Sequence, residues 1–251
     1  MPCQGPSRGA PPAGGLPGAS GGGTLAAVRV LRVLRERGEA ISARVRDEVT
    51  GALRAERSAA GGPSPAAQVR AAQVAHAVLD GEGGRARSLV HAPACSAGCS
   101  WCCHVHAYAT GPEILAVAAY LGETLPAGAL EALRERLERH VERADRLSDD
   151  ERWAARIPCA LLDAAGRCTV HPARPLRCRA FHSCSVDACR DAFDGLREAP
   201  APTSPALDRA NDAVEDGYDR ALADAGLSPA GERLEAGLLA ALRAHAGTGA
   251  P

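Results

Sequence analysis

The sequence predicts a mainly α-helical protein whose helices surround an irregular, cysteine-rich centre. Apolar residues recur at three- and four-residue steps over most of the chain, which is typical of helices with one buried face. Nine of the ten cysteines lie in two clusters, and the segment that carries the second one, residues 157–194, lacks this periodicity. No pair of alternating, β-branched segments with a hairpin signal occurs in the sequence.

The apolar core must be built mostly from Leu and Val, because the 251 residues include only two Phe, two Trp, three Tyr and one Met. Such a thin core would gain from additional cross-links. The formal net charge of −1 argues against a strongly basic nucleic-acid-binding protein. All 29 basic residues are Arg, which excludes a lysine nucleophile.

The first quarter of the chain is predicted to be a tail followed by helices. Residues 1–23 are rich in Pro, Gly and Ala and are expected to be disordered, with Cys3 an incidental thiol. Helices are then expected from Thr24 to Ala60 and over residues 65–80, separated by a Gly-Gly-Pro break. Together they form a predicted N-terminal helical segment, residues 24–90.

Further helices are expected on both sides of the second cysteine cluster. Thr110-Gly-Pro-Glu113 is typical of a helix start, and the apolar pattern continues to Leu121. A longer, charged helix is predicted over 127–147, and residues 157–194 are expected to form loops with short helical turns. The C-terminal segment, 196–251, is predicted to form helices over 206–225 and 229–245, the latter capped by Ser228.

The N-terminal residues do not resemble a signal peptide, and no apolar stretch in the sequence is long enough to span a bilayer. We therefore expect a cytoplasmic protein without membrane or nucleic-acid partners, in which the thiols stay reduced. Reduced, clustered thiols serve metals or catalysis. A disulfide scaffold is the less favoured alternative, because it needs an oxidising compartment.

The first cysteine cluster can present its thiols in two ways. On a helix, Cys95, Cys99, Cys102 and Cys103 would share an arc of about 100°. Alternatively, a loop at Gly98 folds back so that the sulfurs converge on one ion. Adjacent Cys102 and Cys103 are expected to project in different directions and so to serve different ions or one polynuclear centre.

The second cluster is expected to complete the ligand set. About eight thiolates suit two four-coordinate sites for zinc or iron, or an iron–sulfur cluster, within a predicted metal-binding domain over residues 91–195. Several thiolates leave excess negative charge, and four arginines among the cysteines could offset it. The second cluster comprises Cys159, Cys168, Cys178, Cys184 and Cys189, and the interleaved arginines are Arg174, Arg177, Arg179 and Arg190.

Histidines near the clusters offer further ligands or catalytic groups. His104 and His171, together with Cys184, are candidates for additional metal ligands. His104 and His106 could instead act as an acid–base pair over an open metal position, which would make the protein an enzyme. His91 and His182 are near the clustered cysteines as well, and Trp101 could shield a centre from water.

Several motifs occur in combination over roughly residues 91–195: Cys95-x3-Cys99-x2-Cys102-Cys103, Thr110-Gly-Pro-Glu113, Pro158-Cys159-x3-Asp163-x2-Gly166-Arg167-Cys168-x2-His171, Arg174-Pro175-x2-Cys178-Arg179-x-Phe181 and a trailing Cys189. Together they resemble the YkgJ-type cysteine-cluster family. The resemblance implies a zinc- or iron-chelating domain with eight characteristic cysteines. Its implied ligands here are Cys95, Cys99, Cys102, Cys103, Cys159, Cys168 and Cys178, with Cys189 as the eighth and Cys184 competing for that place.

Two enzyme hypotheses remain beside simple chelation. Similar domains occur in protein-modifying enzymes such as flagellin lysine methylases, which makes a metal- or iron–sulfur-dependent modifying enzyme the alternative function. Cys95-x3-Cys99-x2-Cys102 also matches the three-ligand spacing of radical S-adenosylmethionine enzymes. The barrel of that superfamily needs repeated strand–helix units, whereas this sequence predicts helices and loops. The sequence leaves the metal, the substrate, the protein partner and the oligomeric state open.

Overall fold

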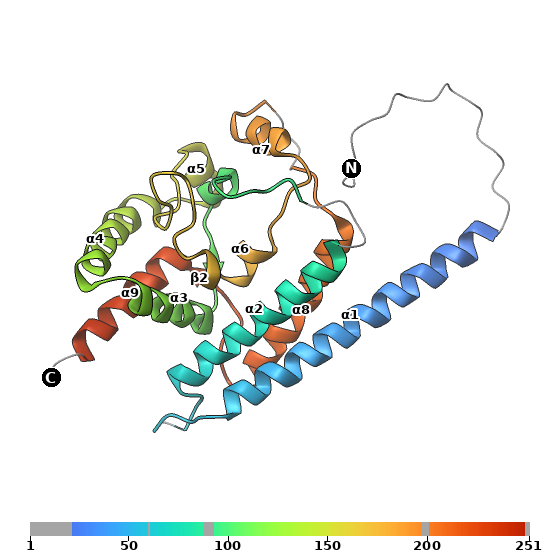
Figure 1. Cartoon of the computed structure of the whole chain (residues 1–251), viewed down its shortest axis with the longest axis horizontal. Coiled ribbons are helices and arrows are strands. Elements are labelled where there is room, and N and C mark those ends of the chain that lie inside the picture. Colours follow the sequence, from blue (N-terminus) through green and yellow to red (C-terminus); the bar gives the residue numbers. More distant parts are fainter. Residues whose placement is uncertain (1–21, 60, 88–92, 197–200, 249–251) are drawn as a thin grey trace.

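The computed structural model describes residues 22–59, 61–87, 93–196 and 201–248 (Figure 1). Cys3, His91 and residues 1–21 of the predicted tail lie outside these ranges. The described residues form a mainly helical fold, as predicted. Its longer helices are α1 (Gly22–Arg54), α2 (Pro65–Arg87), α3 (Gly111–Thr124), α4 (Ala127–Ala144), α8 (Pro205–Asp224) and α9 (Leu234–Thr248). Shorter elements are α5 (Asp149–Ala154), α6 (Leu176–Ala180), α7 (Val186–Phe193), the 3₁₀ turns η1 (Trp101–His104) and η2 (His171–Ala173), and strands β1 (Tyr108–Ala109) and β2 (Glu232–Arg233).

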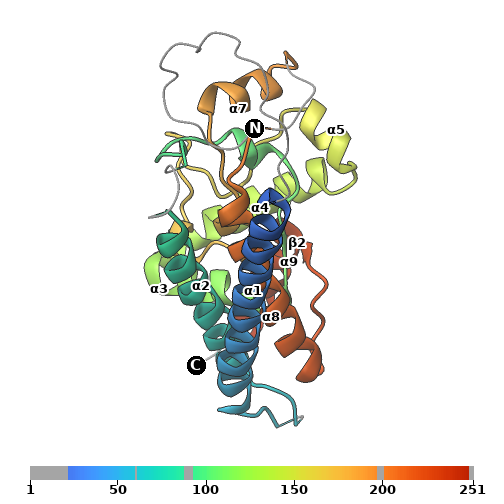
Figure 2. The ribbon, with the colours of Figure 1, turned by 90° about the vertical axis from the view of Figure 1, so that its right-hand side faces the viewer.

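Helices α1, α2 and α8 pack side by side and enclose one apolar cluster (Figures 1 and 2). Gly217 of α8 lies where α8 crosses α1: a Cβ atom there would stand 2.3 Å from the carbonyl oxygen of Ser42 and 2.9 Å from Cβ of Val45. Glycine therefore permits the close approach of these two helices. The cluster also includes Leu176 at the start of α6, so it reaches the cysteine-bearing segment.

A second apolar cluster lies between α3, α4 and α9. Leu133 and Leu137 of α4 face Leu234 and Leu238 of α9 within it. Residues from the cysteine-bearing loops join this cluster: Leu161 is fully buried there, and Cys159 and Cys168 pack against its edge. The loops thus share a core with helices from outside them.

Strands β1 and β2 form a two-residue antiparallel pair, with Tyr108 opposite Arg233 and Ala109 opposite Glu232. This pair corrects the prediction for the last helix, which begins at Leu234 and not at residue 229. The expected cap, Ser228, accepts a hydrogen bond from the Ala230 backbone N–H in the preceding turn. Backbone pairing with a distant strand overrides the local start signal, because those donors and acceptors must be satisfied.

Three more helix boundaries differ from the prediction. The first helix ends at Arg54 and not at Ala60. Helix α2 continues past residue 80 to Arg87, while Glu82 is buried and forms ion pairs with Arg37 and Arg44 of α1. The helix predicted over 127–147 stops at Ala144, because Ser148 and Glu151 form a capping box that starts the separate helix α5.

Helices α5 and α7 lie at one end of the molecule, beyond the packed bundle of α1, α2 and α8 (Figure 2). The turn η1, which carries Cys102 and Cys103, packs against α7 in the same region. Among the described residues, no helix is long and apolar enough to cross a membrane.

Candidate metal centre

The first cysteine segment is a chain of tight turns and not an α-helix. Gly98 has φ +87°, and the Cys99 and Cys103 N–H groups donate to the carbonyl oxygens of Ser96 (3.0 Å) and Ser100 (2.9 Å). Of the two arrangements expected for this segment, the structure has the loop that turns back at Gly98. This brings Cys95 beside residue 183, whose backbone N–H lies 3.3 Å from the Cys95 sulfur.

A short turn presents Cys159 and Cys168. Asp163 closes it, because its carboxylate accepts hydrogen bonds from the backbone N–H groups of Ala165 (2.9 Å) and Arg167 (2.8 Å), and Gly166 takes φ +71°. The Cys159 N–H donates to the carbonyl oxygen of Cys103 at 2.7 Å. That backbone hydrogen bond joins the two cysteine segments directly.

Cys178 is placed by Glu113, a buried side chain at the start of α3. One carboxylate oxygen of Glu113 accepts from the Thr110 N–H and hydroxyl, both at 2.8 Å, which forms the predicted helix start. The other oxygen accepts from the Leu176 N–H at 2.6 Å and so caps α6, which carries Cys178. The sequence indicated the first role of Glu113, but nothing local indicated the second.

Cys189 lies on α7, which an aromatic cluster holds against η1. The Phe193 ring contacts the rings of Trp101 (centroids 5.1 Å apart), His104 (4.6 Å) and Trp153 (5.6 Å). The Arg156 guanidinium stacks 4.3 Å from the centre of the Phe193 ring. Trp101 is therefore a packing residue that joins the two elements carrying Cys102 and Cys189.

The charges of the thiols affect one another's pKa values in two sets that overlap at Cys102. Burial raises the pKa of Cys95 and of Cys99, and charge on Cys102 and Cys189 adds to both shifts. Cys95, Cys99, Cys102 and Cys189 therefore form one neighbourhood, which we call the first group.

The second group comprises Cys103, Cys159, Cys168 and Cys178. Burial is the main cause that raises the pKa of Cys159 well above its usual value and the pKa of Cys178 to about 12, and neighbouring thiolates, Cys168 among them, contribute to both shifts. Charge on Cys159 and Cys178 also adds to the raised pKa of Cys103. The buried thiols stay protonated at neutral pH unless a cation stabilises their charge.

Cys102 and Cys103 do not project apart as expected. Their side chains share a hydrogen bond, which lowers the pKa of Cys102 to about 7 and raises that of Cys103. Charge on Cys102 also acts on Cys168 and Cys178. Cys102 thus lies at the junction of the two groups. Cys184 is disulfide-bonded in the structure and is not one of its free thiols, which corrects the expectation that all the clustered cysteines stay reduced. Its N–H donates to the Pro202 carbonyl at 2.8 Å.

The four interleaved arginines have different surroundings. Arg179 binds both carboxylate oxygens of Asp80, at 2.8 and 3.0 Å, and Arg190 pairs with Asp187 at 2.6 Å. The charge of Arg177 acts on acidic residues of α8. Arg174 alone of the four lowers the pKa of Cys102, Cys168 and Cys178.

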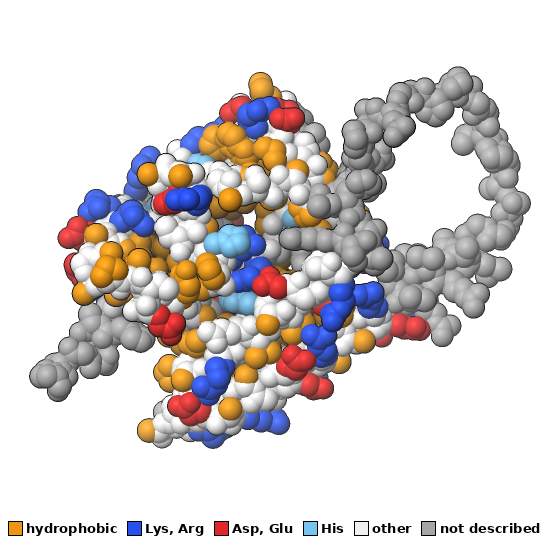
Figure 3. Space-filling view, in the orientation of Figure 1, with side chains coloured by type: hydrophobic (Ala, Val, Ile, Leu, Met, Phe, Trp, Pro, Cys, Tyr) orange, Lys and Arg blue, Asp and Glu red, His pale blue; other side chains and the backbone are white. Residues whose placement is uncertain are grey.

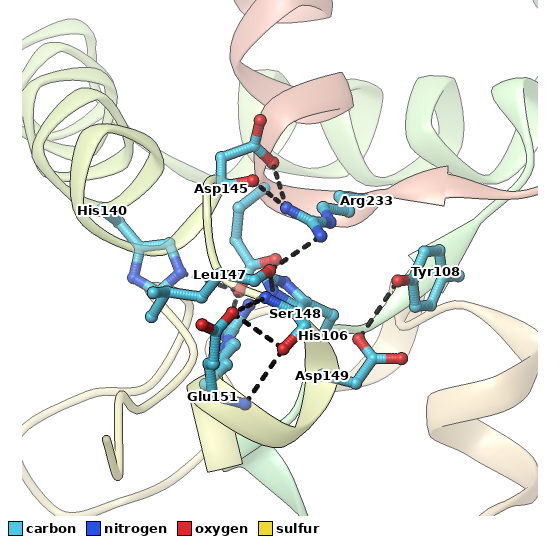
Figure 4. A network of polar contacts seen from close by, with 11 residues as sticks. His106, Tyr108, His140, Asp145, Leu147, Ser148, Asp149, Glu151 and Arg233 are labelled. Carbon is cyan, nitrogen blue, oxygen red and sulfur yellow. Dashed lines mark hydrogen bonds and ion pairs between the residues drawn. The ribbon is translucent and has the colours of Figure 1, made fainter. Parts of the chain in front are cut away.

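A buried polar network connects the segment before β1 with α4, α5 and α9 beside the second group. Arg152 donates to Nδ1 of His106 at 2.9 Å and to Glu235 at 2.7 Å, and the Glu235 carboxylate raises the pKa of Cys159. Since arginine only donates, His106 is neutral with its proton on Nε2, which donates to the Leu147 carbonyl at 3.1 Å. Figure 4 shows His106, Leu147 and Arg233 in this network.

The other candidate histidines also have non-metal contacts. Nδ1 of His104 lies 3.1 Å from the Ser100 carbonyl oxygen, and both ring nitrogens of His182 are hydrogen-bonded to backbone groups. Burial lowers the pKa of His171, and the charges of Arg174 and Arg179 lower it further. Histidine and arginine side chains gather near the middle of the face shown in Figure 3.

Sequence reasoning missed Arg152 and Glu235 as buried ionic residues. Their partners are 46 and 83 residues away in sequence, so no local pattern marks them. In the described part of the chain, no three His, Cys, Asp or Glu side chains converge closely enough to hold a metal ion. The chemistry of the donors nevertheless fits zinc or iron, since thiolates bind both metals.

Residues 94–197 match the model of the CxxCxxCC family, described as a "putative zinc- or iron-chelating domain". The match covers both cysteine clusters and confirms the resemblance found in the sequence. No curated protein and no solved structure matches the chain.

Proposed function

From the CxxCxxCC family match we propose that this protein binds two zinc or iron ions, one in each group of four cysteines, without catalytic turnover. The first group, Cys95, Cys99, Cys102 and Cys189, would hold one ion. The second group, Cys103, Cys159, Cys168 and Cys178, would hold the other. A bound ion would stabilise the thiolate form and tie together loops that have little core of their own.

The grouping of the thiols carries this proposal. Charges on Cys99, Cys102 and Cys189 act on Cys95, while those on Cys168 and Cys178 act on Cys159. In the described residues these side chains do not converge on one point, so ion binding would require them to move. The hydrogen bond from Cys159 to the Cys103 carbonyl supports the pairing of these two residues in one group.

Two cysteines compete for the place of the eighth ligand. Cys189 is supported by its electrostatic effect on both Cys95 and Cys99. Cys184 follows Ser183, which contacts Cys95, but it is disulfide-bonded in the structure and would have to be reduced before it could bind an ion. The two candidates lie on opposite sides of the start of α7 and can be separated by mutation.

The test is elemental analysis and visible absorption of the full chain purified without oxygen. We expect two metal ions per chain in the wild type, one in Cys189→Ser and two in the matched control Cys184→Ser. Cys178→Ser should also retain one ion, and the Cys178→Ser/Cys189→Ser double variant should retain none. The proposal fails if the wild type holds no stoichiometric metal, or if Cys184→Ser loses an ion and Cys189→Ser does not.

The alternative is a metal- or iron–sulfur-dependent protein-modifying enzyme. It needs an open metal position and an acid–base group. His106 does not suit that role, because both of its ring nitrogens are engaged in the buried network. A groove of about 530 Å³ between α1 and α8 is lined by no cysteine. A brown protein with near-stoichiometric iron and sulfide would favour this alternative over chelation.

A further inference from the structure

The largest aromatic side chains of this protein gather at its surface and not in its core. The sequence has only two Trp and two Phe. Trp101 and Trp153 both contact Phe193, and all three residues remain partly exposed. Neither of the two apolar clusters described above includes any of them. Large aromatic side chains that stay in contact with solvent are typical of protein-binding sites.

Exposed apolar side chains extend this surface. Val105 follows His104, whose ring contacts Phe193, and is 39 % exposed. Leu196 lies three residues after Phe193 and is 78 % exposed. Figure 3 shows apolar side chains gathered over α7, with charged side chains beside them. The residues that we call the aromatic surface are Trp101, Val105, Trp153, Phe193 and Leu196.

One cation already lies on the aromatic surface. The guanidinium carbon of Arg156 is 4.3 Å from the centre of the Phe193 ring and 5.5 Å from that of the Trp153 ring. Arg156 has φ +53°, a left-handed conformation that strains residues other than glycine, and it is held there by its contacts with the rings and the Trp153 carbonyl. The rings of this surface thus accept a guanidinium group, which indicates the kind of side chain that suits them.

The short helices that carry the aromatic surface, α5 and α7, are acidic. Asp150 lies one turn before Trp153, and Asp194 directly follows Phe193. Both carboxylates are exposed, and neither forms an ion pair with any residue that the structure describes. The acidic side chains of the two helices and of the residue after α7 are Asp149, Asp150, Glu151, Asp187, Asp191 and Asp194. Free carboxylates beside exposed rings favour a cationic partner.

We propose that the aromatic surface binds a basic segment of a partner protein, in which apolar side chains alternate with Arg or Lys. The apolar side chains of that segment would cover Val105, Leu196 and the rings. Its cationic side chains would pair with Asp150 and Asp194 and stack on the exposed ring faces. No cysteine takes part in these contacts, so the proposal goes beyond metal chelation and does not depend on it.

The chain carries its own reporter of this surface, because its only two tryptophans both belong to it. The experiment titrates the full-length chain, as purified, with a synthetic peptide of Arg and Leu and follows tryptophan emission. Peptides of Glu and Leu, and of Arg and Ser, test the charge and the apolar part separately. We expect a saturable change with the Arg–Leu peptide, weaker binding of the Arg–Ser peptide and none of the Glu–Leu peptide. The affinity should fall as the salt concentration is raised.

Substitutions at exposed positions test the surface without disturbing the fold. Asp150→Asn/Asp194→Asn should weaken binding of the Arg–Leu peptide by about 2- to 30-fold, since each exposed charge pair contributes little by itself. The matched control Asp47→Asn/Glu123→Gln removes two exposed carboxylates from α1 and α3, which also lack an ion pair with any described residue, and should bind as the wild type does. Leu196→Ser should weaken binding by about 10-fold, because an apolar side chain would no longer be covered.

Three results would overturn the inference. The first is that the Arg–Leu peptide does not bind, or that the Glu–Leu peptide binds equally well. The second is equal affinity of the wild type, Asp150→Asn/Asp194→Asn and Leu196→Ser for the Arg–Leu peptide, because the peptide would then bind elsewhere. The third is self-association of the wild type in sedimentation velocity that Leu196→Ser abolishes, because the surface would then join two copies of this chain. Metal content is measured separately, so none of these results bears on the proposed function.

Discussion

Breaking the ion pair between Arg152 and Glu235 should lower the free energy of unfolding by several kcal/mol, because both residues are almost fully buried, at 1 % and 2 % exposure. Arg152 Nη2 lies 2.7 Å from Glu235 Oε1. Nε2 of His140 is 3.2 Å from the same oxygen, without the alignment of a hydrogen bond. Burial alone would raise the pKa of Glu235, but the contacts with His140 and Arg152 outweigh it and hold the pKa at about 2.

The magnitude follows from that pKa. Its ordinary value is 4.5, so the folded state favours the Glu235 carboxylate by about 3 kcal/mol at neutral pH. Because the folded pKa is depressed, this contribution is present above pH 4.5 and is lost as the pH falls toward 2. Removing one member of a buried pair typically costs about 3–5 kcal/mol, which agrees with this figure.

The assay is urea unfolding of the metal-free chain at pH 7 and at steps down to pH 3. Arg152→Met should lose about 3 kcal/mol at pH 7 and show a weaker acid dependence below pH 4.5. The double variant Arg152→Met/Glu235→Met should recover part of the loss, since no buried charge of the pair is left without its partner. The control Arg139→Met removes an exposed ion pair with Glu135 and should change stability by less than about 0.5 kcal/mol. The reasoning is refuted if the free energy of unfolding of Arg152→Met at pH 7 stays within about 1 kcal/mol of the control and falls below pH 4.5 as steeply as that of the wild type.

Three further predictions concern packing and pH. Gly217→Ala should lower the free energy of unfolding, measured in urea, by about 1–3 kcal/mol, because its Cβ would overlap α1. The control Gly51→Ala has nothing within 4 Å of its Cβ and should be neutral or stabilising. Equal stability of the two variants would contradict the close crossing of α8 and α1. Burial, followed by the charge of Arg179, lowers the pKa of His76 from 6.5 to about 4. As the pH falls from 6.5 to 4, the unfolded chain takes up a proton at His76 and the folded chain does not. The free energy of unfolding should therefore decrease by up to about 3 kcal/mol over this range. His76→Phe should flatten that part of the pH profile, and an unchanged slope would show that His76 is not the titrating group. Phe193→Ala should lower the free energy of unfolding by about 2 kcal/mol. It should also shift tryptophan emission to longer wavelength, because Trp101 and Trp153 both lose a ring contact. Unchanged emission would exclude the aromatic cluster.

Much of the helical fold could be predicted from local sequence because its signals are local. The start of α3 is confirmed at Thr110, where the capping box and the proline in the first turn both occur. The capping box of α5, Ser148-Asp-Asp-Glu151, is equally local and directly follows the range predicted for the preceding helix. Where long-range contacts decide, as at the β2 pairing before α9, local reasoning placed the boundary wrongly.

The candidate site could be predicted only in part for the same reason. Spacing identified the cysteines, but their division into two groups depends on a fold-back at Gly98 and on a hydrogen bond between Cys159 and Cys103. The second role of Glu113, as the cap of α6, joins residues 63 positions apart. Such contacts become visible only when the whole chain is folded.

The apolar cluster shared by the cysteine-bearing loops and α9 makes the cysteine region depend on the C-terminal part of the chain. All the described cysteines lie before residue 190, whereas Leu234, Leu238, Leu239 and Leu242 of α9 complete the apolar cluster against which Cys159 and Cys168 pack. Glu235, on the same helix, closes the buried network beside them. A premature stop codon or a proteolytic cut before α9 would therefore leave all the described cysteines in the product. It would nevertheless remove the helix that completes the apolar cluster against which Cys159 and Cys168 pack.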